Sequence, residues 1–430
     1  MTRLKKMSPV RFIVLGFAIV ILLGSILLSL PISHNPGVDV TPIDALFTST
    51  SAVCVTGLVT LDTGSTFSIF GRIIIAILIQ IGGLGFASVG VGLMLLTRRR
   101  VRFKERILIK ETLNLNSMKG IVKLVRAILF MTLFFEIIGT LINYTVFSKS
   151  YSPLNAVGIS IFHSISAFNN AGFDILGNFQ SLASYKDSII LNIATCGLII
   201  FGGLGFIVIK EIIEKHSFKN FSLHSKVVVT MTLTLLLSGA IMLKITENIN
   251  WLTAFFFSTS SRTAGFATIS LNEFSNAGLF IMIILMFIGA SPGSTGGGIK
   301  TTAMFALLVN AYSTATNNHC SAFKRKIPRD VISKAYIIAS LAIALICTNI
   351  LLISIFEPNF EFMDIFFEVV SAFGTVGLST GITPDLGIYS KSIIILTMFI
   401  GRLGPLTIAT LLAFKQKSGV SYSEEPLTVG

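Results

Sequence analysis

Charged residues are scarce in this chain of 430 residues. They make up 12% of it, whereas 53% of the residues are hydrophobic and the mean hydropathy is +0.83. Because soluble globular domains carry charge on about a quarter of their residues, this composition excludes an ordinary water-soluble fold. A lipid bilayer is the solvent that fits such a chain.

Cysteine and histidine are also few, and their positions exclude several kinds of site. The four cysteines show no paired or CxxC spacing, which argues against a disulfide framework or a zinc site. The five histidines are scattered, with no HExxH or GxSxG arrangement near them. We therefore expect neither an enzyme nor a cofactor held by this chain.

Long apolar runs are what the sequence does contain. Eight stretches of roughly 20 residues or more could each cross a bilayer core, and they lie near 12–31, 70–97, 124–147, 187–209, 225–245, 276–314, 335–356 and 391–414. The first follows four basic residues, as the core of a secretory signal would. Its length and the seven stretches after it favour a retained helix.

Basic residues predict the orientation of these stretches. If both termini lie on one side, 25 of the 33 lysines and arginines share that side. The positive-inside rule makes it cytoplasmic, and we expect a multi-pass protein of a bacterial plasma membrane. Topology and anionic lipid account for the net charge of +13, so nucleic acid is not expected as a partner. The basic segment 98–126 fits contact with lipid and contact with a protein partner equally well.

Four ten-residue segments between the apolar stretches repeat one pattern. They are SAVCVTGLVT (51–60), SAFNNAGFDI (166–175), TSSRTAGFAT (259–268) and SAFGTVGLST (371–380), and they align without gaps. Each copy has an anchoring glycine: Gly57, Gly172, Gly265 and Gly377. Six positions earlier lies a hydroxyl residue (Ser51, Ser166, Thr259, Ser371), and ten positions earlier a phenylalanine (Phe47, Phe162, Phe255, Phe367). Four copies in register indicate an internal fourfold repeat.

The apolar stretch after each segment contains a second matching motif. GGLGF occurs at 82–86 and 202–206, GASPG at 289–293 and GRLGP at 401–405, and each predicts a break in its helix. We predict an all-α membrane protein in which four parallel helix, pore loop, helix repeats with eight transmembrane spans surround a central pseudo-fourfold pore. The predicted units are 12–97, 124–215, 224–314 with a broken inner helix, 334–415, and a C-terminal tail at 416–430.

Each ten-residue segment is too short to span a membrane, so we expect it to enter as a half-helix and return as an extended strip. Irregular backbone at membrane depth is tolerated where it lines water. The negative ends of four half-helices would favour a cation, and backbone carbonyls could replace its hydration water. The predicted ion-binding strips are Val55, Thr56 and Gly57; Asn170, Ala171 and Gly172; Thr263, Ala264 and Gly265; and Thr375, Val376 and Gly377. Glycines that merely pack helices together are the alternative, but packing would not demand the flanking register.

A glycine-rich run interrupts the sixth apolar stretch. We expect an irregular, mobile loop beneath the strips, made of Ala290, Ser291, Pro292, Gly293, Ser294, Thr295, Gly296, Gly297, Gly298, Ile299 and Lys300. A phosphate-binding loop is the competing interpretation, but Ile299 separates the glycine from the lysine and no βαβ strand precedes it.

Two arginines fall at membrane depth. Arg402 lies near the centre of the last span, where a charge costs about 2.5 to 3.5 kcal/mol on insertion scales. We predict that it and the 290–300 loop obstruct the lower pore, and an arginine that satisfies loop carbonyls is an alternative compatible with that role. Arg262, three residues before Gly265, fits a structural ion pair better than an ion-repelling role.

These motifs resemble the KtrB branch of the Trk/Ktr/HKT superfamily of potassium transporters. The resemblance covers nearly the whole chain and depends on the four loops and on GSTGGGIKT and GRLGPLT. It implies K⁺ uptake across the plasma membrane through a channel-like subunit, with the selectivity filter in the strips and a gate at Arg402 and the loop. Each strip has one glycine where tetrameric potassium channels have the signature TVGYG. This difference leaves open how strictly the protein selects K⁺ over Na⁺.

The resemblance also implies partners. A homodimer and a cytosolic ring of RCK-type, KtrA-like subunits are expected, with adenine nucleotides bound only by the ring. K⁺ is the expected transported ion, and Na⁺ is a candidate activator. A Na⁺-permeable or Na⁺-coupled relative is the alternative function.

Overall fold

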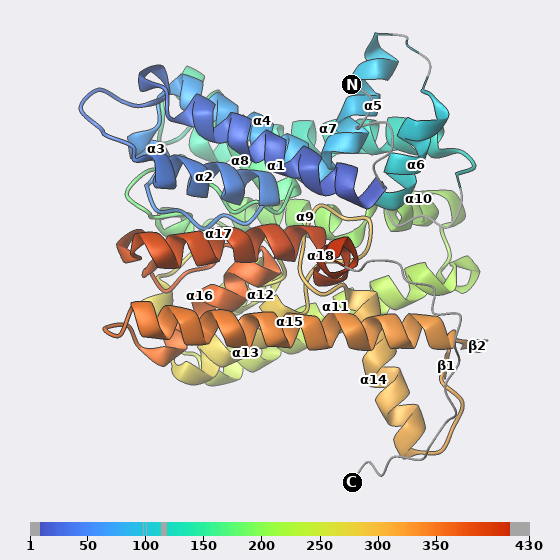
Figure 1. The fold of residues 1–430 in the computed structure, drawn as a ribbon. Helices are drawn as coiled ribbons and strands as arrows, with labels where there is room; N and C mark the ends of the chain where they lie inside the picture. The colour runs from blue at the N-terminus through green and yellow to red at the C-terminus, as the bar shows by residue number, and fades with distance from the viewer. Residues whose placement is uncertain (1–8, 98, 100, 113–117, 413–430) are drawn as a thin grey trace.

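A computed structural model describes residues 9–97, 99, 101–112 and 118–412, and most of them are helical (Figure 1). The predicted tail at 416–430 and the last residues of the fourth predicted unit lie outside this part of the chain. Short 3-10 helices occur at Pro31–Ser33, Ala183–Tyr185, Phe218–Asn220, Leu271–Glu273 and Thr383–Asp385. One small antiparallel sheet pairs β1 (Ser321–Ala322) with β2 (Arg325–Lys326).

The helices follow the predicted order of outer helix, pore helix and inner helix, four times over. The first set is α1 (Pro9–Leu28), α2 (Pro42–Cys54), α3 (Thr63–Thr66), α4 (Ile69–Leu84) and α5 (Phe86–Leu96), with α6 (Phe103–Thr112) after it. The second is α7 (Ile121–Phe147), α8 (Pro153–Phe168), α9 (Ile189–Leu204) and α10 (Phe206–Lys215). The third is α11 (Leu223–Thr246), α12 (Trp251–Ser260), α13 (Asn276–Phe287) and α14 (Thr301–Ala315). The fourth is α15 (Arg329–Phe356), α16 (Phe362–Gly374), α17 (Ile388–Leu403) and α18 (Pro405–Leu412).

Each inner helix breaks where the second motif predicts. Gly85, Gly205 and Gly404 have φ of 77°, 91° and 86°, a backbone conformation that glycine adopts without a steric penalty. The chain bends by 99° between α4 and α5 and by 97° between α9 and α10. In the third set an irregular loop at 288–300 separates α13 from α14. The prediction of broken inner helices is confirmed.

The four sets close into a ring. The inner helix of each set packs against the pore helix of the next, in the pairs α4 with α8, α9 with α12, α13 with α16, and α17 with α2. The last pair joins the end of the chain to its beginning. In Figure 1, α17 lies beside α2, and α15 and α17 have nearly parallel axes but opposite chain directions.

The outward surface of this ring is apolar. On α1, Leu22 and Ile26 are 56% and 62% exposed, and Leu141 on α7 is 64% exposed, as suits contact with lipid hydrocarbon. Among the described helices, α1, α11 and α15 are each long and apolar enough to cross a membrane. The bent pairs α4–α5 and α9–α10 raise that number to five.

A buried ion pair joins the first and last sets. Lys391 Nζ on α17 lies 2.9 Å from Asp44 Oδ1 on α2, and the two side chains are 12% and 9% exposed.

Because Lys391→Met would leave the buried carboxylate without its cation, we expect a loss of about 3 kcal/mol in the free energy of unfolding. Thermal unfolding in detergent measures it. Lys210→Met is the control, since the pair of Lys210 with Glu214 is 3.7 Å long with side chains 37% and 60% exposed, and its loss should cost less than about 1 kcal/mol. Equal shifts for both variants would contradict the structural role of Lys391.

Candidate ion pathway and gate

The four anchoring glycines meet in a closed ring. A Cβ atom added to any one of them would come within 3.0 Å of a carbonyl oxygen of the next strip. The glycine and the oxygen it would meet are Gly57 and Ala171, Gly172 and Ala264, Gly265 and Val376, and Gly377 and Thr56. The order runs once around the four sets and returns to the first. The structure therefore brings the four predicted strips together on one axis.

Each strip has an unusual backbone. The residue two before each glycine has positive φ, at 51° in Val55, 57° in Asn170, 90° in Thr263 and 50° in Thr375. Such values are uncommon for residues other than glycine, most of all for β-branched ones, and persist where surrounding structure fixes them. The middle residues Thr56, Ala171, Ala264 and Val376 are fully buried. The strips are thus held in a conformation that ordinary strands do not adopt.

The repeated spacing of the hydroxyl residue has a structural reason in two sets. Ser51 Oγ accepts a hydrogen bond of 3.0 Å from the Gly57 N–H, and Ser371 Oγ accepts one of 3.1 Å from the Gly377 N–H. A serine at this position therefore ties the glycine back to the end of its pore helix.

The gapless alignment is wrong for the third set. Thr259 Oγ1 donates to the Phe255 carbonyl within its own helix, whereas Ser260 Oγ donates to the Phe266 carbonyl in the returning strip. Likewise Phe256 is 1% exposed, but Phe255 is only half-buried. The pore helix α12 is therefore shifted by one residue relative to its counterparts, because its loop reaches the glycine in one residue fewer.

A cavity of about 310 Å³ lies on one side of the ring and is lined by all four anchoring glycines. Asp62 and Asp174 also line it, and their carboxylates give this vestibule negative character. Asp62 accepts hydrogen bonds from the N–H groups of Ser65 and Phe179, which fixes its position. The pore helices end just before the strips, so their partial negative ends lie near the ring.

The 290–300 loop lies against the ends of the strips. An added Cβ at Gly296 would meet the Thr263 side chain, and one at Gly297 would meet that of Thr375. The Thr295 N–H donates to the Gly202 carbonyl at 3.2 Å. Residues 288 and 299 form a bridge that closes the base of the loop. The irregular loop predicted beneath the strips is present and largely buried, and its mobility stays a prediction.

Arg402 links this loop to the first set. Its guanidinium donates to the Thr295 carbonyl in the loop and to the carbonyls of Gly82 and Gly83 at the end of α4, the last at 3.3 Å. Lys300 Nζ donates to the Gly296 carbonyl at 2.7 Å. Two cations therefore lie on or beside the loop. Because Arg402 both satisfies loop carbonyls and places charge there, the two interpretations of it are compatible.

The chain is similar to known proteins over nearly its whole length. It matches the TrkH family model, described as a cation transport protein, over residues 11–247 and 224–423. The potassium/sodium uptake protein NtpJ of Enterococcus hirae is 39% identical over 99% of this chain and 98% of its own. The Ktr system potassium uptake protein B of Bacillus subtilis is 35% identical over 99% and 97%. The chain belongs to the TrkH family.

The fold of this TrkH-family protein also matches a solved structure. The crystal structure of the potassium transporter TrkH from Vibrio parahaemolyticus superposes with a TM-score of 0.73 at 19% identity, covering 93% of this chain and 84% of that one. The protein is accordingly a multi-pass membrane protein of the TrkH fold, and members of this family are transporters rather than enzymes.

Arg262 differs from its prediction. It is 7% exposed, and among the described residues no acidic group pairs with it. Its Nε has no hydrogen-bond partner within residues 9–97, 99, 101–112 and 118–412. The expected structural ion pair is therefore wrong.

The sequence-based prediction also missed a polar cluster next to the second strip. Glu136 on α7 and Gln80 on α4 both accept hydrogen bonds from the Asn169 side chain. A signal was available, because Glu136 is the one acidic residue away from the ends of the eight predicted spans.

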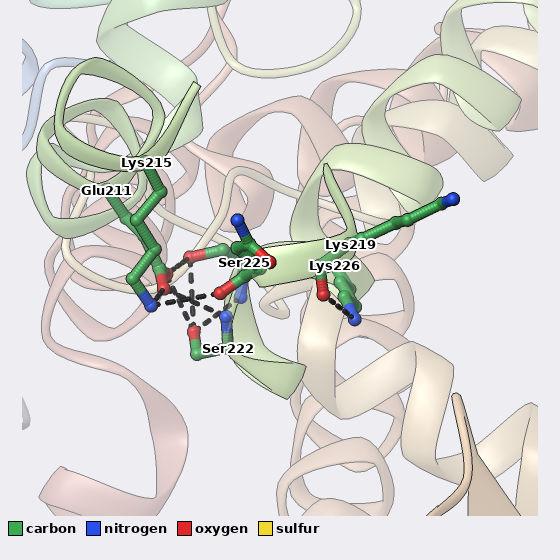
Figure 2. A network of polar contacts seen from close by, with 7 residues as sticks. Glu211, Lys215, Lys219, Ser222, Ser225 and Lys226 are labelled. Atoms are coloured by element: carbon green, nitrogen blue, oxygen red, sulfur yellow. Dashed lines mark hydrogen bonds and ion pairs between the residues drawn. The ribbon is translucent and has the colours of Figure 1, made fainter. Parts of the chain in front are cut away.

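A second polar network fixes the far end of the bent inner helix in the second set (Figure 2). Glu211 on α10 accepts hydrogen bonds from Lys215, from the N–H and hydroxyl of Ser222, and from the Ser225 hydroxyl. Ser222 is the N-cap of α11. The network therefore ties α10 to the start of the next outer helix. At its other end α10 meets the loop, where the Phe206 N–H donates to the Gly293 carbonyl at 3.1 Å.

Loss of the Glu211 charge should loosen this junction. For Glu211→Gln we expect a loss of about 2 kcal/mol in the free energy of unfolding, because several charge-assisted hydrogen bonds weaken at once. Thermal unfolding of the purified protein is the measurement. Glu214→Gln, which alters the long, exposed pair with Lys210, is the matched control. A Glu211→Gln protein as stable as the control would rule out the network as a structural tie.

Proposed function

We propose that this TrkH-family chain is the channel-like subunit that passes K⁺ into the cell in a Ktr-type uptake system. The closed ring of four glycine strips is the observation that carries the proposal, since a ring of backbone carbonyls can replace the hydration shell of a monovalent cation. Of the two relatives described above, one is named for potassium uptake and the other for potassium/sodium uptake, which supports K⁺ as a transported ion.

The proposed ion-binding residues are those of the four strips. Backbone carbonyls face a cation without the cost of burying a fixed negative charge, and the pore-helix ends add favourable potential. Asp62 and Asp174 in the vestibule would raise the local concentration of cations before they enter the ring.

The proposed gate consists of the 290–300 loop and Arg402. The loop contacts Thr263 and Thr375 at the start of two strips, so it would block the path sterically while it is docked. Arg402 holds the loop to α4 and adds a positive charge that repels a passing cation. Opening then requires the loop to leave these contacts.

Partners and orientation are part of the same proposal. Relatives named as parts of a Ktr system support a subunit that works with other components. We propose a homodimer that carries a cytosolic RCK-type ring, with adenine nucleotides bound by the ring and Na⁺ as a candidate activator. The excess of basic residues on one side supports a plasma-membrane protein with both termini in the cytoplasm.

Growth at low K⁺ tests the function directly. Expressed with a Ktr-type ring in a strain that lacks its own K⁺ uptake systems, the chain should restore growth. Na⁺ competition in K⁺ flux assays tests the less favoured alternative of a Na⁺-permeable or Na⁺-coupled protein. Absence of rescue by a protein that reaches the membrane would contradict the K⁺ assignment.

A further inference from the structure

A buried carboxylate lies directly behind the second strip. Glu136 is 8% exposed near the middle of α7, and its Oε1 accepts a hydrogen bond of 3.1 Å from Asn169 Nδ2. The same amide nitrogen donates to Gln80 Oε1 at 2.7 Å. No lysine, arginine or histidine forms an ion pair with Glu136 in the described chain. An intramembrane acid without a cation is costly, and such residues are usually functional.

The pseudo-symmetry of the ring identifies the counterpart of Glu136 in the next set. Gly139 on α7 and Gly239 on α11 each pack against a leucine of the inner helix and a serine of the pore helix. Glu136 lies three residues before Gly139, and Leu236 lies three residues before Gly239. Leu236 therefore occupies the position of Glu136 in the third set. Gly82 and Gly202 are also counterparts, because each packs against the carbonyl of the residue four positions before an anchoring glycine. Gln80 and Ile200 lie two residues before Gly82 and Gly202, so Ile200 is the counterpart of Gln80.

An unpaired arginine occupies this counterpart site. Arg262 lines a cavity of about 10 Å³ together with Ile200, Gly203, Thr232 and Leu236. A cavity of that size holds at most about one water molecule. The arginine cannot lose its proton in a protein. Its positive charge is therefore uncompensated within the described part of the chain.

Two strip residues connect the two sites. Glu136 bonds to Asn169, and the next residue, Asn170, donates from its Nδ2 to Thr263 Oγ1 at 3.0 Å. Thr263 in turn follows Arg262. A short polar chain at one end of the ring thus has the Glu136 carboxyl group at its start and the Arg262 guanidinium at its finish. Gly296 of the gate loop packs against Thr263, so this end of the ring is the one that faces the gate.

We propose that Glu136 is ionised and that it and Arg262 are opposed charges that set the affinity of the pathway for its cation at the gate end of the strips. The inference rests on the proposed function for the identity of the ion. Neither side chain touches the ion, and each acts through the electric field. Glu136 raises cation occupancy beside the positive charges of Arg402 and Lys300, and Arg262 lowers it, so that the ion binds but still leaves.

The expected effect is large enough to measure. A unit charge about 10 Å from an ion, at an effective dielectric constant of about 20, changes its affinity by roughly tenfold. Glu136→Gln keeps the size of the side chain and its acceptor oxygen but removes the charge. Arg262→Gln removes the opposite charge. The half-saturating K⁺ concentration should therefore rise roughly tenfold in the first variant and fall roughly tenfold in the second.

The test is K⁺ flux into proteoliposomes together with equilibrium binding of K⁺ and of Na⁺ to the purified protein. Opposite shifts in the single variants, with the double variant near the wild type, would support the inference. Shifts in the same direction, or changes confined to maximal rate and thermal stability, would overturn it. If Glu136→Gln fails to fold, Leu236→Glu places an acid beside Arg262 and should raise affinity, and an unchanged or lower affinity would overturn the inference.

Glu214→Gln, an exposed acid on α10, is the control for loss of one negative charge. Binding measurements separate this inference from the function itself. If the wild type binds Na⁺ and carries no K⁺, the K⁺ assignment fails, while opposite shifts in Na⁺ affinity would still support the paired charges.

Discussion

A Gly265→Ser variant is expected to lose K⁺ transport down to the level of empty vesicles. Gly265 has φ of 79°, and an added Cβ would run into the Val376 carbonyl and lie 3.1 Å from the Cα of Gly377. Both obstacles are backbone, so no side chain can swing away. Relief requires a shift of the fourth strip, which would displace the carbonyls that are proposed to hold the ion. Left-handed backbone also costs a non-glycine residue about 1 to 2 kcal/mol.

Flux in proteoliposomes and growth at low K⁺ measure this loss. Gly158→Ser is the control, because Gly158 lies on the pore helix α8 with open space around it and ordinary φ. The control should transport like the wild type. A Gly265→Ser protein that folds and still conducts K⁺ with unchanged selectivity would show that the ring of glycines is not the filter.

An Arg402→Ala variant is expected to raise K⁺ flux in the absence of any regulatory partner by tenfold or more. The substitution removes the hydrogen bonds to Thr295 in the loop and to Gly82 and Gly83 in α4. Hydrogen bonds to a charged group contribute about 1.5 to 3 kcal/mol each, and 1.4 kcal/mol changes an equilibrium about tenfold. The docked loop should therefore be populated less.

Arg402→Lys separates the two ways in which Arg402 could obstruct the path. Lysine keeps the charge but lacks the planar fork that reaches several carbonyls at once. Low flux in Arg402→Lys with high flux in Arg402→Ala would assign the block to charge, and high flux in both would assign it to the tie between loop and α4. Flux that stays at the wild-type level in both variants would contradict any gating role.

Much of the architecture was predictable because the membrane restricts what a chain can do. Apolar runs give the spans, and irregular segments too short to span must line water or be buried in protein. The four glycines were identifiable from their common register, and the structure brings them into one ring. The glycine motifs in the inner helices marked bends because positive φ at Gly85 and Gly205 is a local property of the residue.

What the sequence could not provide were contacts between residues far apart in the chain. The one-residue shift of α12 depends on how Ser260 and Phe256 pack, and a gapless alignment cannot reveal packing. Among the described residues Arg262 has no acidic partner, because α11 has Leu236 at the position where α7 has Glu136. Arg402 was placed correctly in the last inner helix, but its three carbonyl partners lie more than 100 residues away along the chain.

The carbonyls of the four strips are proposed to surround a dehydrated cation on the ring axis. An experimental structure of the protein with Tl⁺ or Rb⁺ in place of K⁺ tests this proposal most directly, because the anomalous signal locates the ion. Peaks are expected on the axis bounded by Gly57, Gly172, Gly265 and Gly377. Peaks elsewhere in the fold, with a ring axis that stays empty at saturating ion concentration, would contradict it.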